Sequence, residues 1–292
     1  MLLSMTGFGR AVRTFGETKI TIEVRALNSK ITDIRFKMPL AYKEKEIDLR
    51  RTITEQADRG KIDVNISVDS LSGESAFIIN HELFKRYYAE LSQLKKELGI
   101  KTGDVLQAIA RLPNIAGGED VPLSEEQWTE TEGAMNDALK DFTHFRLKEG
   151  EAMEKDLRLR NKNILEKLEA VKNFEGERME KMRQRMRQNL EEYMNKENVD
   201  ENRFEQEVLF YLEKIDITEE KVRLAQHIRF LDETLNDKKN TSKGKTLNFI
   251  TQEIGREINT LGSKAYSADI QHVVVAMKDE LEKMKEMIAN VV

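Results

Sequence analysis

One segment near the C-terminus combines carboxylates, amides, hydroxyls and cationic side chains at helical spacing. It covers residues 252–264 and reads QEIGREINTLGSK. At about 100° of rotation per residue, a stripe about 60° wide carries two carboxylates, a hydroxyl and an amine, from Glu253, Glu257, Thr260 and Lys264. An adjoining stripe carries Gln252, Arg256, Asn259 and Ser263. Side chains of these types can hold a metal ion, a phosphate or both.

The other side of this helix is apolar, so the polar stripes border a core. A face made only for solubility would carry mostly Glu and Lys, whereas this one uses short or geometrically specific hydrogen-bonding groups. The structural alternative is a salt-bridged helix in which Glu253 and Glu257 simply pair with Arg256 and Lys264.

The preceding helix offers a matching polar face, formed by Glu220, Arg223, His227 and Thr234. If the two faces meet across a groove, His227, Glu253 and Glu257 would present one imidazole and two carboxylates to Mn²⁺ or Mg²⁺. Glu220 is a possible fourth ligand. A lone helical histidine is more often a packed or surface residue than a ligand, so this ligand set needs independent support.

These groups match the needs of phosphodiester hydrolysis, which are a metal-activated water, charge neutralisation at the phosphate and a proton donor to the leaving oxygen. The candidate catalytic residues are His227, Glu253, Glu257 and Lys264. Arg223, Arg256 and Lys264 would serve the phosphate. No Walker-type loop is present, so we expect no nucleotide cofactor.

Composition limits the classes of protein and partner. The chain has 292 residues, a charged fraction of 35% and a net charge of −5, so any nucleic-acid binding must come from local patches. There are no cysteines, which leaves metal binding to His, Asp and Glu and fits a cytoplasmic protein. No run of about 18 apolar residues occurs, so we expect no membrane partner.

The hydrophobic pattern predicts an α+β fold. Apolar residues alternate over residues 20–26 and 62–68, as in half-buried antiparallel strands, with a helix at residues 39–58 between them and a further strand within residues 4–15. Helical spacing takes over from residue 84, and a run with hardly a breaker extends from residue 124 to about residue 195. We expect an α+β unit at residues 1–72, a helical continuation at 73–123 with a hinge loop near 114–121, a long helical arm at 124–200 and a C-terminal helical domain at 201–292.

The long helix contains a basic cluster interleaved with methionines, made of Arg178, Lys181, Arg183, Arg185 and Arg187. A solvated face beside a methionine packing stripe is favoured over a contact with the RNA backbone.

Three strings in this order resemble the YicC family of bacterial proteins, also called YicC/YloC. They are SMTGFGR at residues 4–10, EVRALNSK at residues 23–30 and QEIGREINTLGSK at residues 252–264. Further matching positions include Arg59, Gly60 and Lys61, and in the last third Glu207, Asp216, Ile217, Glu219, Glu220, Arg223, Leu224 and His227. The similarity extends over the whole chain.

The resemblance implies a metal-assisted endoribonuclease that assembles as a ring-like homo-oligomer, expected to be a hexamer, and closes around RNA. The expected RNA-binding residues are Arg10, Arg25, Asn28, Lys30, Arg223, Gln252, Arg256, Asn259 and Ser263. Two positions depart from the family pattern, because Gly255 replaces an expected Asn, and Lys30 with Ile31 replaces an Arg followed by an aromatic. Gly255 lies away from the carboxylate stripe, and Lys30 keeps the charge but loses bidentate geometry. The glycines of SMTGFGR favour a tight backbone path over phosphate binding.

The competing hypothesis is a non-catalytic RNA-binding or adaptor oligomer that grips phosphates with the same face. Paired carboxylates would repel RNA unless a cation is bound, so an adaptor gains little from Glu253 and Glu257. A purely structural helical scaffold would explain the long helix, but not the Asn, Thr and Gln of the polar face.

Overall fold

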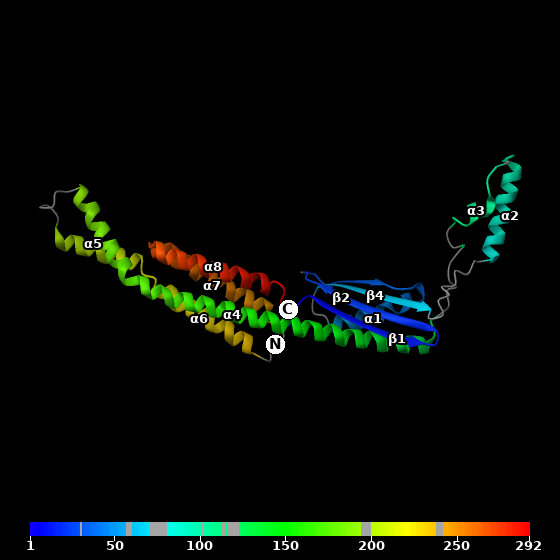
Figure 1. Cartoon of the computed structure of the whole chain (residues 1–292), viewed down its shortest axis with the longest axis horizontal. Helices are drawn as coiled ribbons and strands as arrows, with labels where there is room; N and C mark the ends of the chain where they lie inside the picture. The colour runs from blue at the N-terminus through cyan, green and yellow to red at the C-terminus, as the bar shows by residue number, and fades with distance from the viewer. Residues whose placement is uncertain are drawn as a thin grey trace. The chain divides into compact units, whose positions relative to one another are not determined.

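The computed structural model describes residues 1–29, 31–56, 60–70, 81–100, 102–112, 115, 123–193, 200–237 and 242–292. These residues form two compact units, one from Phe8–Thr143 and one from Met1–Gly7 with His144–Val292. Helix α4 (Glu125–Tyr193) contributes to both units (Figure 1). Within the described ranges, no helix has the length and apolar character needed to cross a membrane.

A four-stranded sheet forms the first unit, in the order β1 (Gly7–Phe15), β2 (Thr18–Leu27), β4 (Lys61–Ser70) and β3 (Asp33–Lys37). Strands β2 and β4 are antiparallel, as predicted, with Ile22 opposite Ile66. The short strand β3, which the sequence pattern missed, runs parallel to β4. The sheet is therefore mixed, and the α+β prediction is confirmed.

Helices cover one face of this sheet. Alternate side chains of β2 and β4 point toward these helices and form a shared core with them. The predicted helix at residues 39–58 is a 3₁₀ helix, η1 (Leu40–Lys45), followed by α1 (Glu46–Gln56). Tyr42 and Ile53 from this region meet Trp128 and Phe142 from the first part of α4 in the same core.

Two further helices of this unit, α2 (His81–Glu97) and α3 (Val105–Ile109), confirm the helical spacing expected there. The predicted hinge near 114–121 lies outside the described residues except for Ile115. The predicted division into four parts stays a prediction.

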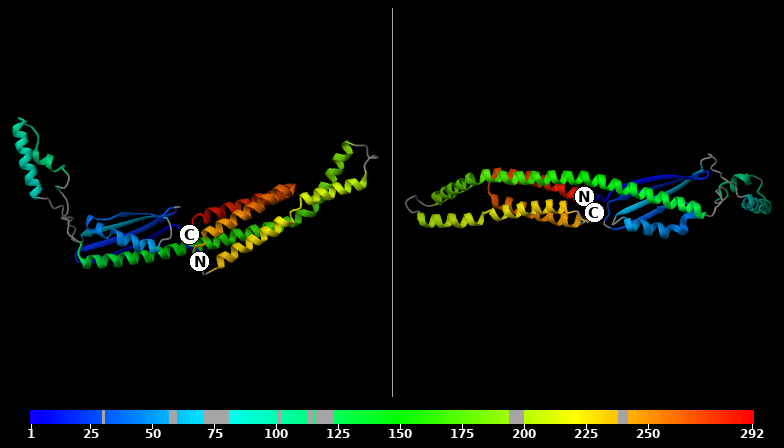
Figure 2. Two further views of the ribbon diagram at one scale, coloured as in Figure 1. Left: turned by 180° about the vertical axis from the view of Figure 1, so that it is seen from behind. Right: turned by 90° about the horizontal axis from the view of Figure 1, so that it is seen from below.

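The second unit is a helical assembly around the rest of α4. It adds α5 (Glu201–Lys214), α6 (Thr218–Asn236), α7 (Gly244–Ala265) and α8 (Ala268–Ile288). Figure 2 shows α6, α7 and α8 lying along α4, and their apolar stripes form one core with Leu157 and Ile164 of α4.

The SMTGFGR string joins the two chain ends within this unit. Ser4 bridges to Val291, Arg146 donates from Nε to the Ser4 carbonyl at 2.6 Å, and Thr6 donates to Glu149 at 2.7 Å. In the sheet unit, a Cβ at Gly9 would overlap the carbonyl oxygen of Ala138. The prediction that glycine permits a tight backbone path is thus confirmed at Gly9.

Candidate functional site

Helix α7 separates its side chains as the helical wheel predicted. The apolar stripe is buried, and the stripe with Gln252, Arg256, Asn259 and Ser263 is exposed. Between them lies the carboxylate stripe, in which Glu253 is half-buried and Glu257 is only 5% exposed. The two carboxylates therefore lie where the polar surface meets the core.

Helices α6 and α7 form an antiparallel pair, fixed at both ends by lysines. Lys264 Nζ lies 2.8 Å from Glu220 Oε1 at one end, and the buried Lys243 donates to the Leu235 carbonyl at 2.8 Å at the other. Moving seven residues inward from the Lys264–Glu220 pair along each helix places Glu257 and His227 at the same level. Glu253 follows one turn further along α7.

The salt-bridged alternative fails at its two predicted pairs. Lys264 pairs with Glu220 of α6 instead of Glu253 or Glu257, and Arg256 forms no ion pair within the described structure. Neither Glu253 nor Glu257 has a hydrogen-bond or ion-pair partner among the described residues. The oxygens of Glu257 are not among the buried, unbonded atoms of the described structure, so its carboxylate is at the edge of the surface and is open to a ligand.

The other polar side chains of this surface differ in whether they have hydrogen-bond or ion-pair partners. His227 is half-buried, and within the described ranges neither it nor Gln252 nor Asn259 has a partner side chain. The hydroxyls of Thr260 and Ser263 donate to carbonyls of their own helix, while Arg223 pairs with Glu219 one turn away. We call the surface formed by His227, Gln252, Glu253, Arg256, Glu257 and Asn259 the α6–α7 polar face.

A complete metal site is not formed by these groups alone. Among the described residues, no three His, Asp or Glu side chains come together as a possible ligand set. Glu220, the possible fourth ligand, has one oxygen on Lys264, and its buried Oε2 has no hydrogen bond in the described structure. The unpartnered Glu257 with His227 at its level fits an ion that takes most of its ligands from water and substrate, as Mg²⁺ usually does.

The predicted N-terminal RNA contacts lie in the sheet unit. Arg10 and Arg25 both reach Glu23, at 3.7 and 3.2 Å, and the Arg25 guanidinium also lies over the Phe8 ring. Asn28 directly follows β2 and is exposed, whereas Lys30 lies outside the described residues. Asp63 of β4 lies opposite Arg25 in the strand register, so two carboxylates accompany these two arginines.

Comparison with known proteins covers both units. Residues 2–155 match a family model described as the N-terminal region of endoribonuclease YicC-like proteins, and residues 171–292 match the model of the C-terminal region. The chain belongs to the YicC-like endoribonuclease family. It is 31% identical to the probable endoribonuclease YicC of Clostridioides difficile over 294 residues, which is 100% of both chains. It is also 30% identical to the probable endoribonuclease YicC of Haemophilus influenzae over 298 residues, which is 99% of each.

Some positions that carry the YicC-like resemblance support the fold. Asp216 accepts hydrogen bonds from the backbone amide and hydroxyl of Thr218, at 2.9 and 2.7 Å, and so fixes the turn that leads into α6. These bonds lower the pKa of Asp216. Gly255 faces α8, where a Cβ would come within 3.1 Å of Leu281, so its departure from the family pattern leaves the carboxylate stripe unchanged.

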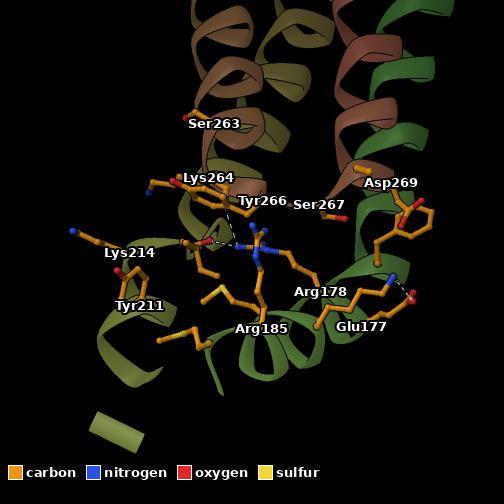
Figure 3. A pocket seen from close by; sticks show the side chains of 16 residues that line it. Glu177, Arg178, Arg185, Tyr211, Lys214, Ser263, Lys264, Tyr266, Ser267 and Asp269 are labelled. Carbon is orange, nitrogen blue, oxygen red and sulfur yellow. Dashed lines mark hydrogen bonds and ion pairs between the residues drawn. The ribbon is translucent and has the colours of Figure 1, made fainter. Parts of the chain in front are cut away.

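The YicC-like C-terminal region also contains a pocket that the sequence did not reveal (Figure 3). It measures about 810 Å³ and lies where α4 meets the ends of α5 and α7 and the start of α8. Ser263 and Lys264 line it, together with three members of the basic cluster: Arg178, Lys181 and Arg185. We call it the Arg178 pocket.

The favoured interpretation of the basic cluster holds for part of it. Arg183 pairs with Glu205, and Arg187 pairs with Glu201, so these two side chains join α4 to α5. Periodicity marks all five cations alike, because only Arg178 is buried and its burial depends on α5 and α7, which come later in the chain. The interleaved methionines were the local signal, since Met182 and Met186 also line the pocket.

Proposed function

We propose that this protein is a metal-dependent endoribonuclease that hydrolyses RNA phosphodiester bonds as a ring-like homo-oligomer, a hexamer, which closes around RNA. Membership of the YicC-like endoribonuclease family supports the reaction class. The observation that carries the proposal is the α6–α7 polar face, where the side chain of Glu257 is nearly buried and its carboxylate has no partner among the described residues.

The exposed stripe of α7 is suited to hold the RNA. Arg256 presents a guanidinium without a carboxylate partner in the described structure, and such a group can bind a phosphate through two parallel hydrogen bonds. Gln252 and Asn259 lie on the same stripe and can bond to bases or to 2′-hydroxyls. We propose Arg10, Arg25, Asn28 and Lys30 as further RNA contacts in the sheet unit.

The half-buried stripe is suited to the chemistry. We propose His227 and Glu257, with Glu253 one turn away, as the groups that hold a divalent cation and move protons at the scissile phosphate. The ion, when bound, supplies a nucleophilic water and neutralises the phosphate. Lys264 is at the C-terminal end of the same stripe, and Glu220 positions its ammonium group through their ion pair.

Exposed apolar side chains support assembly. The rings of Phe210, Phe230 and Phe249, on α5, α6 and α7, are exposed in the single chain. Contacts between copies would remove such surface from water. Light scattering on a sizing column should give six times the mass of the chain.

The function is tested by incubating the protein with end-labelled RNA in Mn²⁺, in Mg²⁺ and in chelator. We expect cleavage that the chelator stops, and a loss of about 100-fold or more in Glu257→Gln and His227→Ala, with a smaller loss in Glu253→Gln. Glu233→Gln, an exposed carboxylate elsewhere on α6, is the matched control and should cleave normally.

Two results would decide against parts of this proposal. Undiminished cleavage by all three variants would remove the site from the α6–α7 polar face. RNA binding without cleavage under either metal would favour the non-catalytic RNA-binding oligomer.

A further inference from the structure

The Arg178 pocket collects cations from three helices. Arg178, Lys181 and Arg185 come from α4, Lys214 from the end of α5 and Lys264 from α7. Two carboxylates, Glu177 and Asp269, also line it. Glu220 lies behind Lys264, and the charge of Asp216 acts on both Arg178 and Lys264. Five cations thus face four carboxylates, and the site has a net positive charge.

The uncompensated charge belongs to particular residues. Lys181 pairs with Glu177 at 2.6 Å, and Lys264 pairs with Glu220 at 2.8 Å. Arg185 has no ion pair or hydrogen bond within the described ranges, and Lys214 there contacts only the Phe210 ring, 5.2 Å from its centroid. In Figure 3 the Arg178 and Arg185 side chains point into the pocket.

Arg178 is the deepest of these cations. It is 6% exposed, and its Nη2 atom donates to the carbonyls of Ile215 and Lys264. Its Nε atom is buried and has no hydrogen-bond partner among the described residues. Burial lowers the pKa of this guanidinium. The charges of Glu175 and Asp216 act on Arg178 without a hydrogen bond to it in the described structure, and they do not offset its desolvation.

The start of α8 adds backbone donors to the same pocket. Ser267, Ala268 and Asp269 line it, and Ser267 makes no side-chain cap to the helix. The N-terminal end of a 21-residue helix thus borders the same pocket as the cations, which is a favourable arrangement for a phosphate. The Asp269 carboxylate at this end contributes to raising the pKa of Lys181, after the larger effect of Glu177.

Aromatic side chains stand at the edge of the pocket. Tyr266 links α7 to α8, has a positive φ of 44° and is 78% exposed. Tyr266 is the C-cap of α7, a position where a left-handed residue commonly ends a helix, and this conformation costs a tyrosine free energy relative to glycine. Tyr211 of α5 lines the pocket as well and is exposed. Such rings can stack on a nucleobase.

We infer that the Arg178 pocket binds the terminal phosphate of a nucleotide, with the attached base against Tyr266 or Tyr211. A phosphate monoester carries close to two negative charges at neutral pH, whereas an internal phosphodiester carries one. The monoester can therefore pair with both Arg185 and Lys214, the two lining cations that have no carboxylate partner among the described residues. The pocket volume lies within the range of small-molecule sites. We take the phosphorylated end of an RNA chain as the ligand, and in this the inference rests on the proposed function. A free nucleoside monophosphate has the same chemistry.

Binding in the presence of chelator tests the pocket without cleavage. Fluorescence anisotropy would compare one short RNA with a 5′-phosphate, with a 3′-phosphate and with hydroxyls at both ends, each also in competition with AMP and with inorganic phosphate. We expect one phosphorylated end to bind about tenfold more tightly than the hydroxyl form. Arg185→Gln and Lys214→Gln should each reduce this preference severalfold.

Arg183→Gln is the matched control, since it removes the same charge from the same helix but lies outside the pocket, where it pairs with Glu205. It should keep the end preference. Competition by AMP without any end preference would identify free nucleotides as the ligand. Equal affinity for all three RNAs with no competition by AMP would overturn the inference.

These results are separable from the proposed function. A protein that prefers phosphorylated ends but never cleaves with Mn²⁺ or Mg²⁺ keeps the pocket and loses the nuclease. A protein that cleaves all three RNAs equally and binds no AMP keeps the nuclease and loses the pocket.

Discussion

At the scale of single residues, the candidate site depends on how each buried charge is compensated. Glu220 and Glu257 are both nearly buried on facing helices, yet only Glu220 has a cation beside it in the described structure. That difference separates a carboxylate that positions Lys264 from one that is available to a ligand. The burial of both follows from their place at the border of the apolar stripes, and their different partners follow from the pairing of α6 with α7.

Replacing Lys264 tests the first of these roles. Lys264→Met leaves the Glu220 carboxylate, whose side chain is 7% exposed, without its cation. We expect the free energy of unfolding to fall by about 2 kcal/mol, less than for a fully buried pair because the Lys264 side chain is 34% exposed. Urea denaturation measures this loss. The double variant with Glu220→Gln should recover most of it, and a double variant as unstable as the single one would contradict the pairing.

Replacement of glycine by alanine is expected to change stability in opposite directions at Gly9 and at Gly176. Gly9→Ala places a Cβ against the backbone of α4 at Ala138 and should destabilise the sheet unit by several kcal/mol, since the backbone has to move. Gly176 lies in α4, and no other part of the described structure comes within 4 Å of the position that an alanine methyl group would take. Gly176→Ala should therefore stabilise the protein by about 1 kcal/mol. Thermal unfolding of both variants checks the contrast, and a stable Gly9→Ala would show that β1 does not pack this closely on α4.

At the scale of elements, periodicity predicted what depends on one segment alone. The three faces of α7, strands β2 and β4, and the length of α4 follow from local apolar spacing, and all are confirmed. Strand β3 was missed because its five residues carry one fully buried side chain, Ile34. The partner of Lys264 lies 44 residues away, and the burial of Arg178 depends on α5 and α7, so neither could be read from spacing.

The contact between α4 and α8 is expected to make the stability of the folded protein depend on pH. Burial alone would raise the pKa of Glu280, but hydrogen bonds from Asn163 and Arg160 and the charge of Lys283 lower it overall. A carboxyl group whose pKa is lower in the folded state contributes stability above its unfolded pKa, and this contribution is lost as pH falls. The window therefore begins near the ordinary glutamate value of 4.5 and extends to lower pH.

Glu280→Gln should be less stable than the unsubstituted protein at pH 7 and should lose less stability between pH 7 and pH values below about 4.5. Urea denaturation at several pH values measures how the free energy of unfolding changes with pH in both proteins. Glu282→Gln is the control on the same helix, because Glu282 is exposed and pairs only with Lys285 in the described structure. If the free energy of unfolding changed with pH equally in the unsubstituted protein and in Glu280→Gln, the pKa of Glu280 would not differ between the folded and unfolded states.

At the scale of the whole molecule, the proposed ring and the proposed phosphate pocket place different demands on the RNA. Cleavage at the α6–α7 polar face requires access to an internal phosphodiester. Binding in the Arg178 pocket requires a chain end. An RNA without ends separates the two demands.

Circular RNA is therefore expected to be cut, because an endonuclease needs no terminus and a ring that opens can admit a closed chain. Its rate should resemble that of the linear RNA of the same sequence with hydroxyl ends, since neither presents a terminal phosphate to Arg178 and Arg185. Denaturing gels that follow the conversion of circles to full-length linear product measure this first cut. Degradation of the linear RNA with intact circles would mean that the enzyme starts from an end, which contradicts endonucleolytic cleavage. Fast cleavage of circles, at the rate of phosphorylated linear RNA, would instead show that end binding does not assist the reaction.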